Sequence, residues 1–265
     1  MPVKILCLGD IVGKPGRLAL QELLPKLIED RGIDLVVANA ENAAGGSGLS
    51  PPIFEKILRT GVDVCTMGDH TFRKREVIPI LEQSDRLVRP ANFPAVPVVP
   101  GKGLTFALSR SKVKVAVMNV MGRVFMPPSD DPFRIIDGVL ASLPSETTVR
   151  IVDVHAEATS EKVAMGWHLD GRVSAVCGTH THVQTADERI LPGGTAYLTD
   201  LGMTGSYAGV IGMNKADVLA RFTSVTARRA EHSSGDVRIC AAVLDIDEET
   251  GRARNIERLN LSHNQ

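Results

Sequence analysis

Three short apolar runs alternate with helix-like segments over the first 83 residues of the chain. The runs 3–9, 34–39 and 62–67 are typical of buried β-strands, and the leucines between the first two recur at helical spacing. This β-α-β-α-β order favours parallel strands joined by right-handed crossovers. The chain is therefore expected to be an α/β protein built on a sheet rich in parallel strands.

The remaining sequence continues this alternation. Pro25 lies inside the first helical pattern, where a proline should kink or divide the helix. A glycine-rich turn is expected at Gly202 and Gly205. No repeat, low-complexity segment or linker interrupts the 265 residues, so residues 1–265 are treated as one domain with two sheets. Helices are expected near 74–83, 133–142, 160–169 and 215–223, and strands at 103–108, 113–120, 149–154, 195–199, 237–247 and 252–260.

Composition excludes several classes of protein. The net charge of −1 gives no global reason to expect binding to DNA or to an anionic membrane, and aromatic residues make up only 4% of the chain. The 4 cysteines lie in or beside separate strand-like runs, which argues against a zinc ribbon and a disulfide framework. No signal peptide or transmembrane stretch is evident. We expect a soluble, cytoplasmic protein with no membrane association.

Metal-competent side chains follow four of the expected strands. Asp10 follows the first strand, and His155 follows the run 149–154. Glu41 and Asn42 follow the second strand, and Asp69 and His70 follow the third. Taken singly, Asp10 would more often be a helix cap and the others turn or surface residues. Because ligands bind at the carboxyl ends of strands in open α/β sheets, their shared placement predicts a site there.

A histidine pair follows another apolar strand-like run. The sequence from Cys177 to His182 reads Cys-Gly-Thr-His-Thr-His, and Gly178 should end the strand. In an extended segment, residues two apart point to the same side, so His180 and His182 are expected to face one place. Neutral imidazole is the commonest metal ligand, and this spacing after a strand favours that role.

These candidates suggest a pair of metal ions. Asp10, Glu41, Asn42, Asp69, His155, His180 and His182 are too many ligands for one tetrahedral zinc. Mixed imidazole and carboxylate ligation favours iron, manganese, zinc or nickel. Two such ions about 3.5–4 Å apart can bridge a hydroxide that attacks phosphorus in line. His70 could then protonate the leaving oxygen as a general acid.

Several motifs resemble a known family of enzymes. Gly9-Asp10, Gly68-Asp69-His70 and Gly178-Thr179-His180-Thr181-His182 resemble the calcineurin-like metallophosphoesterases. The segments GDIVGKPGR, NAENAAGGSGL, RPANFP, HAEATSEK, GTHTHVQTAD and TDLGMTG resemble the YmdB-type bacterial phosphodiesterases more closely, over nearly the whole chain. The resemblance implies a four-layer α/β/β/α sandwich, with two mixed sheets flanked by helices. It also implies a di-iron or di-manganese centre (Fe2+/Fe3+ or Mn2+).

The resemblance further implies how the ligands divide. Asp10, Glu41, Asn42 and His182 would hold the first metal, with Glu41 bridging. The second metal would be completed by Asp69, His155 and His180, with His70 as proton donor.

Two positions depart from the expected pattern. The general superfamily has a histidine two residues after the first aspartate, where this chain has Val12, a trait shared with the YmdB-type pattern. The second departure is particular to this chain, since Asp69 replaces the asparagine of the family's Gly-Asn-His. The extra negative charge is expected to favour a more oxidised or higher-charge metal pair and to lower attraction for an anionic substrate.

We therefore expect a binuclear metal-dependent phosphodiesterase that hydrolyses 2′,3′-cyclic or 3′,5′-cyclic nucleotides or short phosphodiesters, and that forms a homo-oligomer. Loop residues Arg89, Asn92 and Arg123 could reach the phosphate or base, although solvated surface is the more ordinary role for an arginine. One alternative is a regulatory protein that binds RNA or nucleotides and uses the metals only to hold phosphate. Another is a phosphomonoesterase on the same centre.

Overall fold

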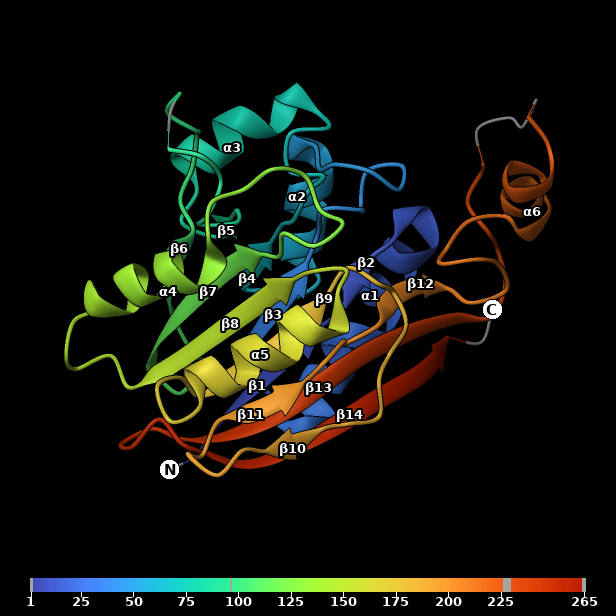
Figure 1. Ribbon diagram of the computed structural model, residues 1–265. Coiled ribbons are helices and arrows are strands. Elements are labelled where there is room, and N and C mark those ends of the chain that lie inside the picture. Colours follow the sequence, from blue (N-terminus) through green and yellow to red (C-terminus); the bar gives the residue numbers. More distant parts are fainter. Residues whose placement is uncertain (1, 96, 226–229, 264–265) are drawn as a thin grey trace.

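The computed structural model describes residues 2–95, 97–225 and 230–263, in which two β-sheets pack face to face between layers of helices (Figure 1). The first sheet has the order β2-β12-β13-β1-β3-β4-β5, with β14 paired to the other edge of β13. Strands β1, β3, β4 and β5 are parallel, and β13 runs antiparallel to β1. Its strands are β1 (Pro2–Leu8), β2 (Asp10–Ile11), β3 (Leu35–Asn39), β4 (Val64–Thr66), β5 (Leu87–Val88), β12 (Met203–Ser206), β13 (Val237–Asp247) and β14 (Ala253–His263).

The second sheet has the order β10-β11-β9-β8-β7-β6. Its four inner strands are parallel, and an antiparallel strand closes each edge. Its strands are β6 (Leu104–Leu108), β7 (Lys114–Met121), β8 (Val149–His155), β9 (Ala175–Thr179), β10 (Arg189–Ile190) and β11 (Ala196–Leu198). The helices are α1 (Gly13–Arg31), α2 (Pro51–Arg59), α3 (Ile78–Gln83), α4 (Pro132–Ala141), α5 (Thr159–Leu169) and α6 (Lys215–Thr223), with a 3-10 turn at Arg75–Val77 before α3.

Three apolar layers hold the sandwich together. On β1, Leu6 and Leu8 belong to the core under α1 and α2, whereas Ile5 and Cys7 belong to the core between the two sheets. The third core lies between the second sheet and helices α4 and α5, which cover that face in Figure 1. Strands buried on both faces need apolar residues at every position, which explains their continuous hydrophobic runs. The four-layer α/β/β/α prediction is confirmed.

Two local features differ from what the sequence predicts. Pro25 does not divide the first helix, because α1 runs from Gly13 to Arg31, and the burial of Leu20, Leu24 and Leu27 against the first sheet offsets the hydrogen bond that proline removes. Of the expected glycine-rich turn, Gly202 precedes the strand with a positive φ of +79°, whereas Gly205 lies in strand β12, which pairs with β2 and β13. A β-carbon at Gly9 would lie 2.1 Å from the carbonyl oxygen of Gly202, so glycine allows the chains to approach there.

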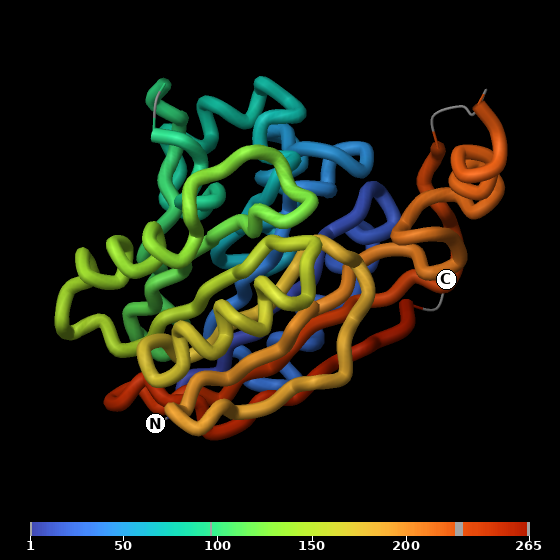
Figure 2. The backbone as a smooth tube through the Cα atoms, viewed as in Figure 1, coloured from blue at the N-terminus to red at the C-terminus, as the bar shows by residue number. Residues whose placement is uncertain are grey.

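One helix stands apart from the sandwich. The trace in Figure 2 carries α6 out from the edge of the molecule, and none of its side chains is buried. Its Leu219 and Phe222 are exposed. Within the described ranges, the helices are too short or too polar for any to span a bilayer.

Candidate metal centre

Five strands deliver the candidate side chains to one edge of the sandwich. In the first sheet, Asp10 lies in β2 just after β1, and the segments after β3 and β4 carry Glu41 and Asp69. In the second sheet, His155 is the last residue of β8, and His180 follows β9 directly. Because the carboxyl ends of parallel strands meet at one edge, residues far apart in sequence come together there.

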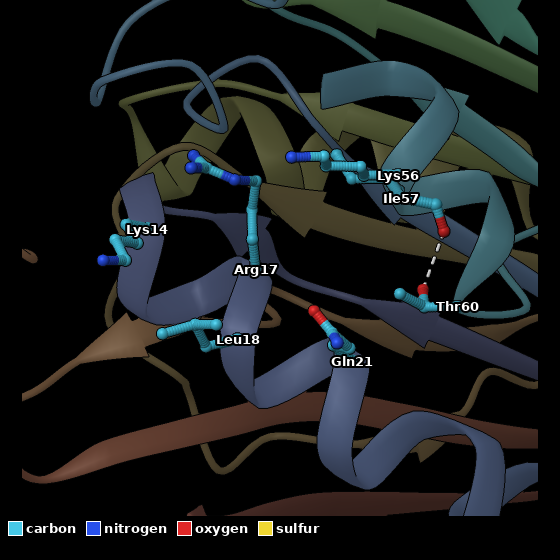
Figure 3. A pocket seen from close by; sticks show the side chains of 7 residues that line it. All are labelled: Lys14, Arg17, Leu18, Gln21, Lys56, Ile57 and Thr60. Atoms are coloured by element: carbon cyan, nitrogen blue, oxygen red, sulfur yellow. Dashed lines mark hydrogen bonds between the residues drawn. The ribbon is translucent and has the colours of Figure 1, made fainter. Parts of the chain in front are cut away.

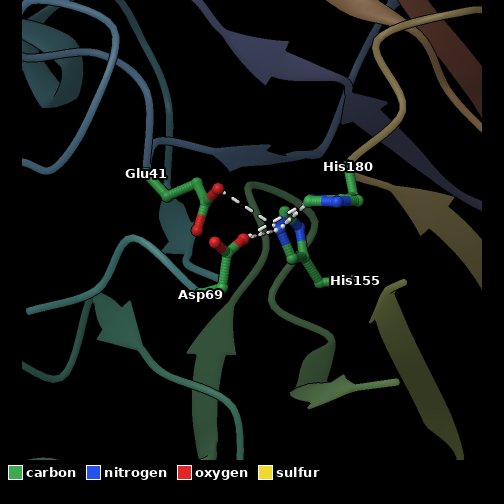
Figure 4. Close-up of side chains that lie close together, drawn as sticks. All are labelled: Glu41, Asp69, His155 and His180. Atoms are coloured by element: carbon green, nitrogen blue, oxygen red, sulfur yellow. Dashed lines mark hydrogen bonds and ion pairs between the residues drawn. The ribbon is translucent and has the colours of Figure 1, made fainter. Parts of the chain in front are cut away.

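One group of four side chains has the geometry of a metal site. Glu41, Asp69, His155 and His180 each offer a ligand atom, and these atoms lie within 4.8 Å of one another (Figure 4). Nε2 of His155 is 3.2 Å from Oδ1 of Asp69 and 3.2 Å from Oε1 of Glu41. Nδ1 of His180 is 3.0 Å from Nε2 of His155. Two carboxylates and two imidazoles fit a transition metal or zinc better than calcium or magnesium.

A second group adjoins the first through Glu41. The Asn42 amide nitrogen lies 3.1 Å from Nε2 of His182, 3.4 Å from Oδ1 of Asp10 and 3.4 Å from Oε1 of Glu41. An amide binds metal through oxygen, so Asn42 fits a metal only after a flip that exchanges its oxygen and nitrogen. With that flip, a carboxylate, an amide oxygen and an imidazole face one position beside Glu41.

His180 and His182 turn opposite ring nitrogens towards the centre. His182 donates from Nδ1 to the carbonyl oxygen of Ile211 at 3.0 Å, so its Nε2 faces Asp10 and Asn42. His180 instead directs Nδ1 to the cluster, and its Nε2 lies 3.2 Å from Oε2 of Glu157. Partners on the far nitrogen fix the tautomer and orientation of metal-binding histidines.

His155 is supported by a buried hydrogen-bond chain. Its Nδ1 is 2.9 Å from Oγ1 of Thr179, which in turn donates to Oδ1 of Asp153 at 2.7 Å. Thr66 also donates to Asp153, whose pKa burial raises to about 6. This chain leaves Nε2 of His155 available to the cluster.

Burial and the neighbouring charges shift the pKa values of the cluster residues in opposite directions. Burial would raise the pKa of Asp10, but its hydrogen bond to His182 and the charge on that imidazole hold the pKa below the ordinary range. Burial would likewise raise the pKa of Asp69, but its hydrogen bonds to His155 and His180 hold the pKa below the ordinary range. Burial would lower the pKa of His155, yet the charge on Glu41 and a hydrogen bond to Asp69 raise it. Ionised, buried carboxylates of this kind need a cation, which suits a metal centre.

His70 lies on the open side of the centre. Its side chain is 27% exposed, whereas the His155 side chain is fully buried. Nδ1 is 2.7 Å from Oδ1 of Asn42, and the backbone N–H donates to Oε2 of Glu41 at 2.8 Å. The imidazole is therefore held next to the cluster and is accessible to an incoming ligand.

The backbone that carries the histidine pair is not extended. His180 has φ +98° and His182 has φ +65°, a region that is uncommon for residues other than glycine. The expectation that an extended segment would align them is wrong. Each such conformation costs about 1–3 kcal/mol and persists only where neighbouring contacts maintain it.

Two of the loop residues proposed to reach substrate have structural roles. The Arg89 guanidinium donates to the carbonyl oxygens of Pro90, Val99, Pro100 and Gly101, which ties a proline-rich loop together. Asn92 is fully buried and donates to the carbonyl oxygens of Met121 and Asp130. The side chain of Arg123 is exposed.

A cationic cavity of about 160 Å3 lies between α1 and α2 (Figure 3). Arg17, one of its lining residues, donates to the carbonyl oxygen of Ala43, next to Asn42. Gly13 at the start of α1 donates to the carbonyl oxygen of Asn42 itself. Helix α1 thus braces the loop that bears Glu41 and Asn42. The cavity is lined by Lys14, Arg17, Leu18, Gln21, Lys56, Ile57 and Thr60.

The paired sheets, with acids and histidines gathered at their strand ends, define an α/β sandwich of the metallophosphoesterase type. The chain belongs to the YmdB-like protein family, which it matches over residues 6–259. It is 46% identical over 257 residues to a Bacillus subtilis protein named 2′,3′-cyclic-nucleotide 2′-phosphodiesterase, and the match covers 97% of this chain and 96% of that protein.

Two solved structures share the fold throughout. A hypothetical protein from Thermus thermophilus superposes with a TM-score of 0.91 at 41% identity, covering 99% of this chain and 100% of that one. A protein from Mycoplasma pneumoniae, described as a novel phosphatase, gives a TM-score of 0.92 at 32% identity, covering 99% and 94%.

Proposed function

We propose that this chain is a metal-dependent phosphodiesterase that hydrolyses nucleoside 2′,3′-cyclic phosphates, with 3′,5′-cyclic nucleotides and the 2′,3′-cyclic ends of short RNAs as further substrates. The cluster of Glu41, Asp69, His155 and His180 carries the proposal. The name of the Bacillus subtilis relative supports the choice of substrate.

The proposed ligands form two sets that share one carboxylate. Asp10, Asn42 and His182 would hold one metal and Asp69, His155 and His180 the other, with Glu41 between them. Iron is the metal we propose, and manganese fits the same donors. Two bound ions supply a nucleophile at neutral pH and neutralise charge on the phosphate.

The chain itself supplies orientation and a proton. Nδ1 of His70 lies against the side-chain amide of Asn42, so the opposite nitrogen, Nε2, is the one that can donate to a leaving oxygen. Nε2 is also 3.5 Å from Oδ2 of Asp69. We propose that His70 protonates the ribose oxygen released when the cyclic ester opens.

The same arrangement of side chains would also suit two other functions. The description of the Mycoplasma pneumoniae protein as a phosphatase supports a phosphomonoesterase. A regulatory protein could instead use the centre to hold a phosphate without hydrolysing it.

A comparison of matched substrates separates these functions. Metal-loaded protein is given 2′,3′-cyclic AMP, 3′,5′-cyclic AMP and 3′-AMP at equal concentration, and the products are resolved by chromatography. A phosphodiesterase opens the cyclic esters and leaves 3′-AMP intact. Release of phosphate from 3′-AMP at the faster rate would establish the phosphomonoesterase. Binding without turnover of any substrate would establish the regulatory protein.

A further inference from the structure

A fully buried ion pair lies behind the histidine segment and outside the proposed ligand set. Lys162 of α5 is only 1% exposed, and its Nζ donates to Oδ2 of Asp200 at 2.7 Å and to the carbonyl oxygen of Thr179 at 3.2 Å. Lysine is almost never fully buried in proteins. A buried ion pair is also weak evidence for stability, because apolar side chains of similar volume often do as well. The pair therefore indicates a role other than packing.

Asp200 accepts two hydrogen bonds from Thr181, the residue between the two histidines. Its Oδ2 accepts from the backbone N–H of Thr181 at 3.2 Å and from Oγ1 of Thr181 at 2.7 Å. Its Oδ1 accepts from the backbone N–H of Gly202 at 2.8 Å. The Thr181 side chain is thus directed at Asp200, while the side chains before and after it contact the cluster.

The same contacts enclose His180 from both sides. Lys162 binds the peptide oxygen just before His180, and Asp200 binds the N–H just after it. Between these two points the chain takes the left-handed conformation of His180. A conformation of this kind lasts only where surrounding contacts determine it, and the ion pair supplies them.

The lysine stem has little freedom to move. A β-carbon at Gly178 would lie 2.7 Å from Cδ of Lys162 and 1.7 Å from the carbonyl oxygen of Thr199. Only glycine lets the stem and the neighbouring strand pack this closely on the end of β9. The position of Nζ is therefore fixed by the fold.

We propose that Lys162 and Asp200 are positioning residues that hold Thr181 away from the centre, so that His180 and His182 can bind metal. The inference rests on the metal centre of the proposed function. Loss of the hydrogen bonds to Thr181 would let both histidines leave their strained conformations, so the chain should bind metal more weakly even when folded.

Mn2+ titration of metal-free protein tests this directly, with free Mn2+ followed by electron paramagnetic resonance. Thr181→Val removes the hydroxyl at nearly constant shape, and Thr181→Ser restores it. Asp200→Asn is measured in parallel, so that the proposal is decided even if Thr181→Val fails to fold. Thr195→Val is the matched control, since buried Thr195 donates to the carbonyl oxygen of Val173 at 2.7 Å beside the amino end of β11, away from the centre.

We expect Thr181→Val and Asp200→Asn to weaken Mn2+ binding at least tenfold, with Thr181→Ser and Thr195→Val within about twofold of the wild type. Wild-type affinity in folded Thr181→Val or Asp200→Asn would overturn the proposal. An equal loss in Thr195→Val would also overturn it, because the effect would then be one of general stability. A wild-type chain that takes up no Mn2+ would overturn both this inference and the metal centre. A chain that binds Mn2+ normally but hydrolyses no phosphodiester would overturn only the proposed function.

Discussion

Oδ1 of Asp69 lies 3.2 Å from Nε2 of His155, at a position where the resemblance to related phosphodiesterases implies asparagine. Asp69 is the third carboxylate of the centre, after Asp10 and Glu41, and the imidazoles around it keep its pKa below the ordinary range. The centre therefore carries one more negative charge than the family pattern implies.

Replacing Asp69 with asparagine should raise kcat/KM for an anionic substrate. One charge a few ångströms from the phosphate is worth about 1 kcal/mol in a partly solvated site, or roughly fivefold in rate. The measurement is steady-state hydrolysis of 2′,3′-cyclic AMP with metal content determined on the same samples. An unchanged or lower kcat/KM at full metal loading would reject the explanation.

Replacing His70 with alanine should slow turnover in a way that depends on the leaving group. A general acid contributes about 10²–10⁴-fold when the departing oxygen is a poor leaving group such as a ribose hydroxyl. Bis(4-nitrophenyl) phosphate releases a stable phenolate and needs little proton donation, so its hydrolysis should fall much less. Equal losses on both substrates, with metal retained, would show that His70 does not act as an acid.

Two glycines should respond to alanine in opposite directions. At Gly178 a β-carbon would lie 1.7 Å from the carbonyl oxygen of Thr199, so Gly178→Ala should destabilise the fold by more than ~3 kcal/mol. At exposed Gly138, inside α4, a β-carbon would meet nothing within 4 Å. Gly138→Ala should stabilise the protein by about 0.5–1 kcal/mol through helix propensity. Urea denaturation of the three proteins tests both, and a destabilised Gly138→Ala would refute the explanation.

The buried thiols should resist alkylation at alkaline pH. Burial raises the pKa of Cys65 to about 12. The pKa of Cys7 is also raised, by its hydrogen bond with Cys177 and by burial. Because these two thiols have a higher pKa in the folded protein than in the unfolded chain, their protonated forms contribute to stability below the unfolded pKa. This contribution to stability is lost as pH rises towards the folded pKa.

Iodoacetamide at pH 9 should therefore modify none of the 4 cysteines in native protein and all of them in urea, as mass spectrometry would show. Rapid labelling of native Cys65 at that pH would contradict its assigned burial.

The strands of the sandwich could be predicted because burial on both faces demands continuous apolar runs. Residues 3–9, 149–154 and 237–247 match β1, β8 and β13 closely. The sequence offered no comparable signal for β12, in which Gly205 belongs to a strand only because β2 and β13 lie beside it. Short strands of this kind depend on partners that are distant in sequence.

The residues around the candidate centre also divide into those that a local sequence pattern reveals and those that it does not. Asp10, Glu41 and Asp69 stand shortly after apolar strands, which makes them recognisable without a structure. Asp153 and Lys162 lie within a strand and a helix and carry no such signal. Their contacts with Thr179 exist only because β8, β9 and α5 are neighbours in space. Supporting residues of a site depend on tertiary contacts and are not visible in local sequence patterns.

The most direct test of a two-metal phosphodiesterase is to titrate metal-free protein with Mn2+ while following bound ions and hydrolysis of 2′,3′-cyclic AMP together. We predict that hydrolysis is negligible without metal and reaches its maximum only as the second ion binds to each chain. Undiminished hydrolysis by the metal-free protein, or no hydrolysis with two ions bound, would contradict the account.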